Sequence, residues 1–237
     1  MIKYSKIYFL LKNSEFYYAL LNIRRYKNVK VNKNTLIVIE GFPRCANTFA
    51  FQIFKKSLSL QGLNHSGKIA RHIHTTTQIK HGIKNNIPVL ILIRNPLDAI
   101  ASLLIKFFDL NDLERVKKLI DNSLYYYIIF YNKVQQNKGK IVISDFVQTI
   151  NNYDLVINNV NQKFGTSFKV IIPNKKVEDE VFAKIKEANF AKVNFDEKKL
   201  AIPSEKKKDE KYKLGTLILK SKLYDKARII YKNVIES

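Results

Sequence analysis

The stretch that decides the fold is Thr35-Leu-Ile-Val-Ile-Glu-Gly-Phe-Pro-Arg-Cys-Ala-Asn-Thr-Phe49. The apolar, β-branched run Leu36–Ile39 predicts a buried strand, and the run ends at Gly41 and Pro43. An apolar-periodic helix follows. A strand, a tight turn and a helix N-terminus form a cradle for an anion, because the first N–H groups of the helix lack partners and its dipole favours negative charge. Arg44 adds a positive charge to this turn, which indicates an enzyme acting on a phosphate or sulfate ester.

The spacing of the key residues in this loop differs from that in two other kinds of anion-binding loop. The nucleotide P-loop is G-x-x-x-x-G-K-[ST]; Gly41 and Thr48 occupy its outer positions, but Ala46 and Asn47 replace its second Gly and its Lys. Ordinary ATP or GTP hydrolysis is therefore not expected, because that Lys holds the β- and γ-phosphates. A cysteine phosphatase needs an Arg six residues after its Cys, and the residue six after Cys45 is Phe.

A second motif lies in Pro88-Val-Leu-Ile-Leu-Ile-Arg-Asn-Pro-Leu-Asp-Ala-Ile-Ala-Ser102. It predicts a fully apolar strand followed by a helix, with Asn95 as N-cap and Pro96 in the first turn. Arg94 is then placed at the carboxyl end of a buried strand, where ligands bind in open α/β sheets. A structural alternative is that Arg94 forms an ion pair with Asp98.

The two motifs resemble the donor-binding segments of sulfotransferases that use 3′-phosphoadenosine 5′-phosphosulfate (PAPS). The family's 5′-phosphosulfate loop reads Pro, Lys or Arg, Ser, Gly, Thr, Thr and an aromatic residue. The corresponding residues here are Pro43, Arg44, Cys45, Ala46, Asn47, Thr48 and Phe49. Cys45, Ala46 and Asn47 differ from the family's Ser, Gly and Thr. The family's 3′-phosphate motif pairs an Arg with a Ser eight residues later, as Arg94 and Ser102 do here. The resemblance implies that both sets of residues bind PAPS.

The resemblance also implies a catalytic base. In this family a His after the second strand often deprotonates the acceptor, and His74 holds that position. A neutral imidazole near its usual pKa can take a hydroxyl proton at pH 7. His72 would share a face with His74 if the segment were extended. We expect His74 and Arg44 to be catalytic, with Arg44 neutralising charge on the leaving oxygen. The N-terminus of the helix and the positive charge of Arg44 should lower the pKa of Cys45. We expect Cys45 to line the site and not to act as a nucleophile.

The alternation of strands and helices predicts a single α/β domain, a three-layer sandwich with a central parallel sheet flanked by helices; the resemblance makes this a P-loop NTPase-like sulfotransferase fold. The resemblance covers residues 34–172. Strands are expected near 35–40, 68–73, 88–93, 140–144 and 168–172, and helices near 46–60, 76–85, 96–108, 111–136, 151–163 and 176–189. We expect an amphipathic or appended segment at residues 1–23, a charged linker at 203–213 and a C-terminal helix at 214–237. Lys206–Lys213 is the candidate for the family's C-terminal basic loop, and Asp145 is expected to cap a turn.

Composition sets broader limits. One cysteine in 237 residues excludes an intramolecular disulfide framework and fits a reducing compartment, so we expect a cytoplasmic protein. No apolar run approaches the roughly 20 residues that span a bilayer. The net charge of +22 suits an anionic donor or acceptor, although Lys-rich composition explains most of it. We expect no specific nucleic-acid partner, no metal, and peripheral membrane contact at most.

The expected activity is transfer of a sulfuryl group to a hydroxyl, or alternatively an amine, of a carbohydrate, lipid or small molecule. Two alternatives stay open. One is a divergent P-loop kinase, which would need Mg²⁺ and a Lys from elsewhere. The other is a catalytically silent protein that binds anions or polyanions. The cluster Tyr125–Phe130 is interpreted as helix core, with an aromatic acceptor pocket as the alternative.

Overall fold

The structure, a computed structural model, describes residues 6–21, 26, 28–190 and 208–236. In this part of the chain the sheet has four parallel strands, in the spatial order β2-β1-β3-β4. The strands are β1 (Ile37–Gly41), β2 (Ile69–Arg71), β3 (Val89–Ile93) and β4 (Val142–Asp145). β1 and β3 are buried along their whole length because helices cover both of their faces, as their continuous apolar sequences predict.

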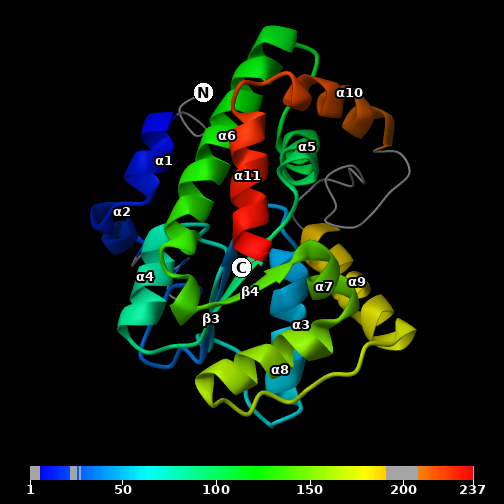
Figure 1. Cartoon of the computed structure of the whole chain (residues 1–237). Coiled ribbons are helices and arrows are strands. Elements are labelled where there is room, and N and C mark those ends of the chain that lie inside the picture. Colours follow the sequence, from blue (N-terminus) through cyan, green and yellow to red (C-terminus); the bar gives the residue numbers. More distant parts are fainter. Residues whose placement is uncertain (1–5, 22–25, 27, 191–207, 237) are drawn as a thin grey trace.

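Helices form a layer on each face of the sheet (Figure 1). One layer contains α4 (Thr76–Lys84), α5 (Pro96–Phe107), α6 (Leu113–Gln135), α10 (Lys208–Leu219) and α11 (Tyr224–Ile235). The other contains α3 (Asn47–Ser59), α7 (Phe146–Asn151), α8 (Tyr153–Phe164) and α9 (Lys175–Phe190). A 3₁₀ turn, η2, spans Lys138–Lys140. The predicted three-layer α/β architecture with a parallel sheet is therefore confirmed.

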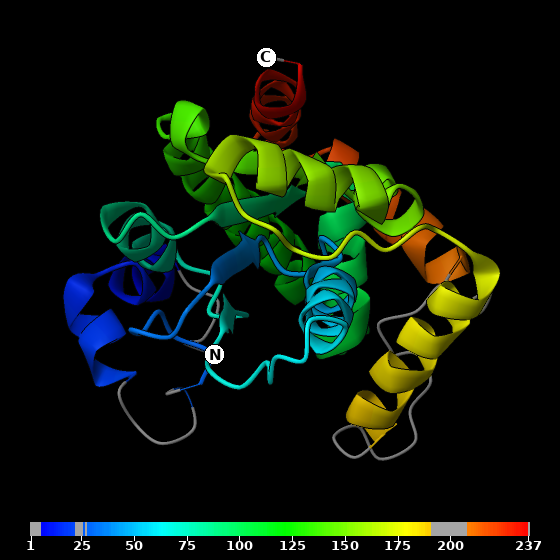
Figure 2. The same ribbon diagram turned by 90° about the horizontal axis from the view of Figure 1, so that it is seen from below.

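Two short helices precede the sheet: α1 (Lys6–Lys12) and α2 (Glu15–Leu20). Figures 1 and 2 both show them at one edge of the molecule, and Figure 2 shows α9 at the opposite edge. The inner side of α1 packs against the hydrophobic core, where Phe9 stacks on Tyr126 of α6 with ring centroids 4.1 Å apart. The expected amphipathic N-terminal segment thus forms two helices, although residues 1–5 and 22–25 lie outside the described residues.

Local sequence signals explain where most helices begin. Asn95, Asp112 and Thr75 each accept a hydrogen bond from a first-turn N–H group of α5, α6 and α4. Asp145 does the same for α7, as expected for a cap residue. The aromatic cluster of α6 is core, since Tyr126, Tyr127 and Phe130 are buried.

Three expectations about elements are wrong. Residues 168–172 are not a strand, because the side chain of Asn161 already hydrogen-bonds both the N–H and the C=O of Phe168. Within the predicted linker 203–213, residues 208–213 are the first half of α10, and 203–207 lie outside the described residues. The predicted C-terminal helix is two helices, because the chain turns at residues 220–223 between α10 and α11.

Candidate functional site

The strand order places one crevice at the carboxyl edge of the sheet. The chain passes from β1 to β2 on one side and then crosses to β3 on the other side. The loops after β1 and β3 therefore diverge at the carboxyl ends of adjacent strands, which is where open α/β sheets bind ligands. Both sequence motifs lie in these two loops. Gly41 closes β1 against β3 so tightly that a Cβ atom there would lie 2.4 Å from the Leu92 carbonyl oxygen.

The loop after β1 has an unusual backbone. Arg44 and Ala46 have φ of 75° and 65°, in the left-handed region that non-glycine residues rarely adopt. In the next loop along the edge, His72 and His74 have φ of 59° and 55°. Strained backbone of this kind clusters at functional sites. Ala46 precedes α3 as its N-cap residue and has no side chain that can accept from the first N–H groups of that helix.

The residues predicted to bind PAPS connect the loop after β1 to the segment after β3. Nε of Arg44 donates a hydrogen bond of 2.9 Å to Oγ of Ser102, on α5. The guanidinium of Arg94 donates one of 3.2 Å to the carbonyl oxygen of Arg44. Burial and the charge of Arg94 lower the pKa of Arg44 to about 10, so Arg44 remains a cation at neutral pH, and burial lowers the pKa of Arg94. The fold thus concentrates positive charge beside a hydroxyl group.

Arg94 also makes the structural contact that the sequence left as an alternative. Its Nη2 lies 4.0 Å from Oδ1 of Asp98, and its guanidinium carbon lies 3.9 Å from the centroid of the Phe146 ring. Asp98 in turn accepts a hydrogen bond of 2.9 Å from Lys211. Lys211 belongs to the candidate C-terminal basic segment, so α10 brings a third cation to the rim of this site.

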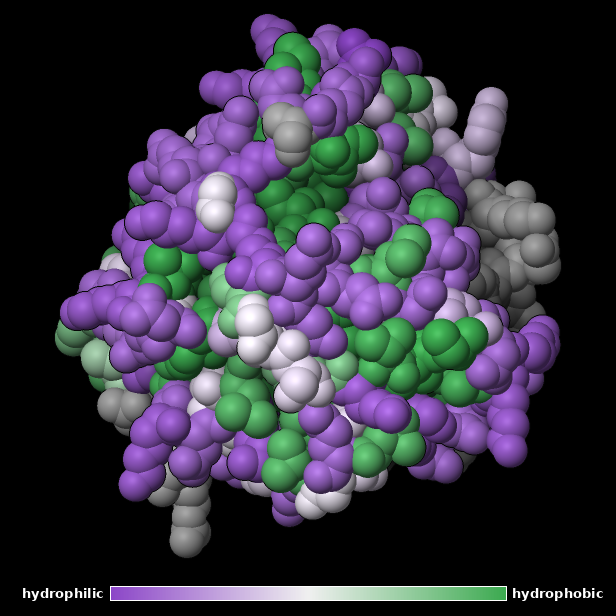
Figure 3. Space-filling model, turned by 60° about the horizontal axis from the view of Figure 1, so that its bottom comes forward, coloured by the Kyte–Doolittle hydropathy of each residue, from purple (hydrophilic) through white to green (hydrophobic). Residues whose placement is uncertain are grey.

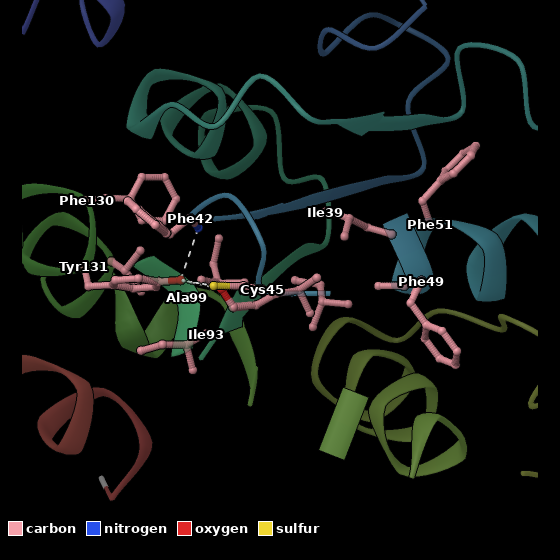
Figure 4. Packing of buried hydrophobic residues seen from close by; sticks show 14 of the residues in the cluster. Ile39, Phe42, Cys45, Phe49, Phe51, Ile93, Ala99, Phe130 and Tyr131 are labelled. Atoms are coloured by element: carbon pink, nitrogen blue, oxygen red, sulfur yellow. Dashed lines mark hydrogen bonds between the residues drawn. The ribbon is translucent and has the colours of Figure 1, made fainter. Parts of the chain in front are cut away.

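Cys45 does not face the crevice. Its side chain is fully buried, and Figure 4 shows it directed toward Tyr131 of α6. The Tyr131 hydroxyl contacts Sγ of Cys45 at 3.5 Å and donates to the Leu92 carbonyl, while the N–H of Phe42 donates to the Tyr131 oxygen. The expectation of a lowered pKa for Cys45 is wrong: burial raises the pKa of this thiol to about 12.

The rest of the predicted loop divides into two groups. Pro43 and Thr48 are partly exposed, whereas Asn47 and Phe49 are buried. Asn47 donates to the Phe42 carbonyl and thereby closes the loop, while its own Oδ1 is buried with no hydrogen-bond partner among the described residues. Phe49 packs between Tyr153 of α8 and Phe182 of α9. Asn47 and Phe49 therefore shape the loop from within.

His74 borders the loop from the β2 side. Its Nδ1 lies 2.8 Å from the Gly41 carbonyl oxygen, which can only accept, so Nδ1 carries the proton and Nε2 keeps a free lone pair. His72 lies beside it, with its Nε2 3.3 Å from Oγ1 of Thr48 and its ring centroid 5.9 Å from that of His74. The segment is not extended, as the positive φ values of both residues show.

The pKa of His74 differs from the expectation. Burial, helped by the charge of Lys12, lowers the pKa of this imidazole to about 3, so it is neutral at pH 7 but a weaker base than an ordinary His. The Tyr126 hydroxyl donates to the His74 carbonyl oxygen and holds the backbone from the other side.

Glu40 is a residue of this site that the sequence analysis missed. It is completely buried at the end of β1, where its carboxylate accepts hydrogen bonds of 2.9 Å from the N–H groups of Ile73 and His74 and one of 2.8 Å from Gln78. Burial raises the pKa of Glu40 to about 7, against the opposing effect of these three donors. A lone acid ending an otherwise apolar strand was the available signal.

A separate groove lies at the free edge of β4. Its volume is about 590 Å³, and it is lined by β4, by α8 and by Val234 and Ile235 of α11. Figure 3 shows a hydrophobic recess in the upper half of the view, surrounded by hydrophilic side chains. The groove at β4 shares only Asp145 with the residues singled out from the sequence, and we base the candidate site on the β1–β3 crevice because the charged groups converge there.

Comparisons with known proteins add no assignment. No protein-family model, no curated protein and no solved structure matches this chain. Within the described residues, no three His, Cys, Asp or Glu side chains gather as metal ligands, and no helix is long and apolar enough to cross a membrane.

Proposed function

We propose that this protein is a sulfotransferase with a P-loop NTPase-like fold, which moves a sulfuryl group from PAPS to an acceptor hydroxyl or amine. The observation that carries the proposal is the hydrogen bond between Arg44 and Ser102. The two residues belong to different motifs, and 58 positions separate them in the chain. Their contact at the β1–β3 crevice is expected if both motifs serve one ligand.

The cations and hydrogen-bond donors in this crevice suit a ligand with two separated anionic groups. The first turn of α3 and Arg44 would bind the 5′-phosphosulfate, since a helix N-terminus and a guanidinium both favour anions. Arg94 and Ser102 would bind the 3′-phosphate, and Lys211 lies close enough to Asp98 to adjust the charge around Arg94. Displacing the Arg44–Ser102 and Arg94–Asp98 contacts would be part of donor binding.

In the proposed reaction the acceptor oxygen attacks sulfur in line, and the bond from sulfur to the phosphate oxygen breaks. Nε2 of His74 takes the acceptor proton, because Nδ1 is committed to the Gly41 carbonyl. Arg44 stabilises the charge that develops on the leaving phosphate. By analogy with phosphoryl transfer, positioning and charge stabilisation supply most of the acceleration. The lowered pKa of His74 implies that the acceptor proton moves late, when the oxygen is already bonding to sulfur.

The test is calorimetric binding of 3′,5′-adenosine bisphosphate, without added metal, to the wild type and to Arg94→Ala and Ser102→Ala. We expect micromolar binding, about −8 kcal/mol, to the wild type and at least tenfold weaker binding to each variant. Arg115→Ala is the matched control, because Arg115 is exposed near the start of α6. Circular dichroism confirms that each variant is folded. Adenosine 5′-monophosphate should bind more weakly than the bisphosphate.

Three results would overturn the proposal. They are no binding, binding that does not depend on the 3′-phosphate, and equal losses in Arg115→Ala and Arg94→Ala. Binding that needs Mg²⁺ and ATP would favour the kinase alternative. Binding that falls steeply with salt and shows no preference among phosphate compounds would favour a silent polyanion binder.

A further inference from the structure

The α1 and α2 helices present apolar side chains to solvent at helical spacing. On α1 these are Ile7, Leu10 and Leu11, at positions i, i+3 and i+4, and on α2 they are Phe16 and Leu20, at i and i+4. Ile7 is 69% exposed and Phe16 is 74% exposed. We call these five side chains the α1–α2 apolar face. Large apolar side chains grouped in this way mark an interaction surface.

The orientation of the α1–α2 apolar face is fixed by contacts on the opposite sides of the two helices. Phe9 stacks on Tyr126. The side chain of Asn13, between the helices, accepts hydrogen bonds from the N–H and hydroxyl of Thr76, at the start of α4. The Tyr18 hydroxyl donates to Gln78. The exposed face is therefore the outer side of two anchored helices, at the edge of the molecule in Figures 1 and 2.

Charge decides which partner fits this face. Residues 1–34 contain eight Lys or Arg and one acidic residue, Glu15, which is paired with His81. A segment with apolar side chains on one face and a basic excess matches a surface that is both apolar and anionic. A second copy of this chain is a poor match, because each copy carries a net charge of +22.

We propose that the α1–α2 apolar face docks on an anionic phospholipid bilayer, with the two helices lying in the plane of the headgroups. The apolar side chains would enter the boundary between headgroups and acyl chains, and the basic excess of residues 1–34 would attract the lipid phosphates. Docking of this kind is peripheral and reversible, and it depends on salt because part of the attraction is electrostatic.

The helices that carry the docking face pack, through their inner sides, next to the candidate base. Lys12 of α1 is close enough to lower the pKa of His74, and Tyr126, on which Phe9 stacks, hydrogen-bonds the His74 carbonyl. If the proposed function holds, on which this step rests, docking brings the His74 side of the crevice to the membrane surface. The acceptor class is then a hydroxyl or amine on a lipid headgroup.

The chain has no Trp, so a single introduced indole reports its own environment. The first measurement is the fluorescence of full-length Leu10→Trp on adding vesicles of phosphatidylcholine, with or without phosphatidylserine. We expect a blue shift only with phosphatidylserine, and quenching by lipids brominated on their acyl chains. Leu155→Trp is the matched control: Leu155 is also exposed, at 49%, but lies on α8. Its emission should not change.

The second measurement is co-sedimentation with the same vesicles. Leu10→Ser combined with Leu11→Ser should bind roughly tenfold more weakly or worse, whereas Leu60→Ser combined with Leu155→Ser should bind as the wild type does. Equal shifts of both Trp reporters, or binding unaffected by the α1 substitutions, would overturn the proposal in favour of nonspecific attraction to Lys residues. A wild-type dimer that dissociates in the α1 double variant would overturn it in favour of a second copy.

The vesicle measurements use no sulfuryl donor, and the calorimetry above uses no lipid. Loss of vesicle binding with intact bisphosphate binding would therefore reject only the membrane surface. The opposite result would reject only the sulfotransferase site.

Discussion

Ala46 has a left-handed backbone at the turn between Pro43 and α3, where the sulfotransferase loop has glycine. Its φ of 65° forces the Cβ atom toward the following carbonyl oxygen. The strain is tolerated because Asn47 holds the loop through the Phe42 carbonyl and Arg44 holds it through Ser102. A residue that fits its backbone poorly persists here because the neighbouring contacts determine the conformation.

Ala46→Gly should therefore raise the free energy of unfolding by about 1 kcal/mol, because glycine adopts this φ without strain. Ala19→Gly is the control, since Ala19 lies in α2 and should lose stability through the ordinary helix penalty of glycine. Urea denaturation measures both. A destabilised Ala46→Gly would mean that the loop does not have this backbone in solution.

Glu40 and His74 make stability depend on pH in opposite directions. The pKa of Glu40 rises from 4.5 to about 7 on folding, so its contribution is full below pH 4.5 and is lost as the pH rises through 7. The pKa of His74 falls from 6.5 to about 3, so the stability that depends on a neutral imidazole is lost as the pH falls from 6.5 toward 3. Above pH 6.5 the effect of Glu40 is the larger of the two.

Between pH 6.5 and 8.5 the wild type should lose about 1 kcal/mol more than Glu40→Gln, which cannot titrate. Urea unfolding at several pH values within this window measures the difference, in which other titrating groups cancel. Parallel pH profiles for the two proteins would show that Glu40 has an ordinary pKa.

At the scale of elements, the approach of α4 to the sheet depends on a glycine. A Cβ atom on Gly82 would lie 2.8 Å from methyl groups of Val38 and Val89, on β1 and β3. These are the two strands whose carboxyl ends carry the candidate site. The distance between α4 and these strands therefore influences the position of the loops at their ends.

Gly82→Ala should destabilise the protein by about 1–2 kcal/mol, because overpacking outweighs the better helix propensity of alanine. Gly215→Ala is a matched control in α10, where a Cβ atom meets nothing within 4 Å. It should gain up to about 1 kcal/mol from propensity alone. Thermal and urea unfolding distinguish the two substitutions, and equal gains would show that α4 can move away from the sheet.

At the scale of the whole molecule, charge opposes compactness. The chain has 42 Lys and Arg against 20 Asp and Glu, so like charges repel one another in the folded protein. Two of the cations, Arg44 and Arg94, are brought together within the protein. This arrangement favours an anionic ligand and an anionic surface.

Adding NaCl up to 0.1 M, where charges are screened beyond about 10 Å, should raise the free energy of unfolding by about 1 kcal/mol. Screening weakens the repulsion among like charges more in the compact state than in the expanded chain. Denaturation in urea, which adds no charge, measures this change. Stability that falls with salt would mean that attractive ion pairs outweigh the net repulsion.

Much of the fold and part of the site are local properties of the chain. The apolar runs at β1 and β3 specify buried strands, and Asn95, Asp112 and Thr75 specify helix starts, because these signals act within a few residues. Arg44 and Arg94 were also visible, because each follows the end of an expected strand and so lies at one edge of a parallel sheet, whereas Ser102 was indicated by the resemblance to the sulfotransferase 3′-phosphate motif. The extra strand at 168–172 was wrong, since the side chain of Asn161 competes for its backbone groups.

The sequence by itself determined the class of fold and the two loops that form the crevice, because periodicity and capping are encoded between near neighbours. Only the tertiary structure decided the pKa values and the orientations of the side chains in and around the crevice. Burial set the pKa of Cys45, His74 and Glu40, and the packing of α6 turned Cys45 away from the crevice toward Tyr131. Desolvation and packing depend on segments distant in the chain, so no local pattern could reveal them.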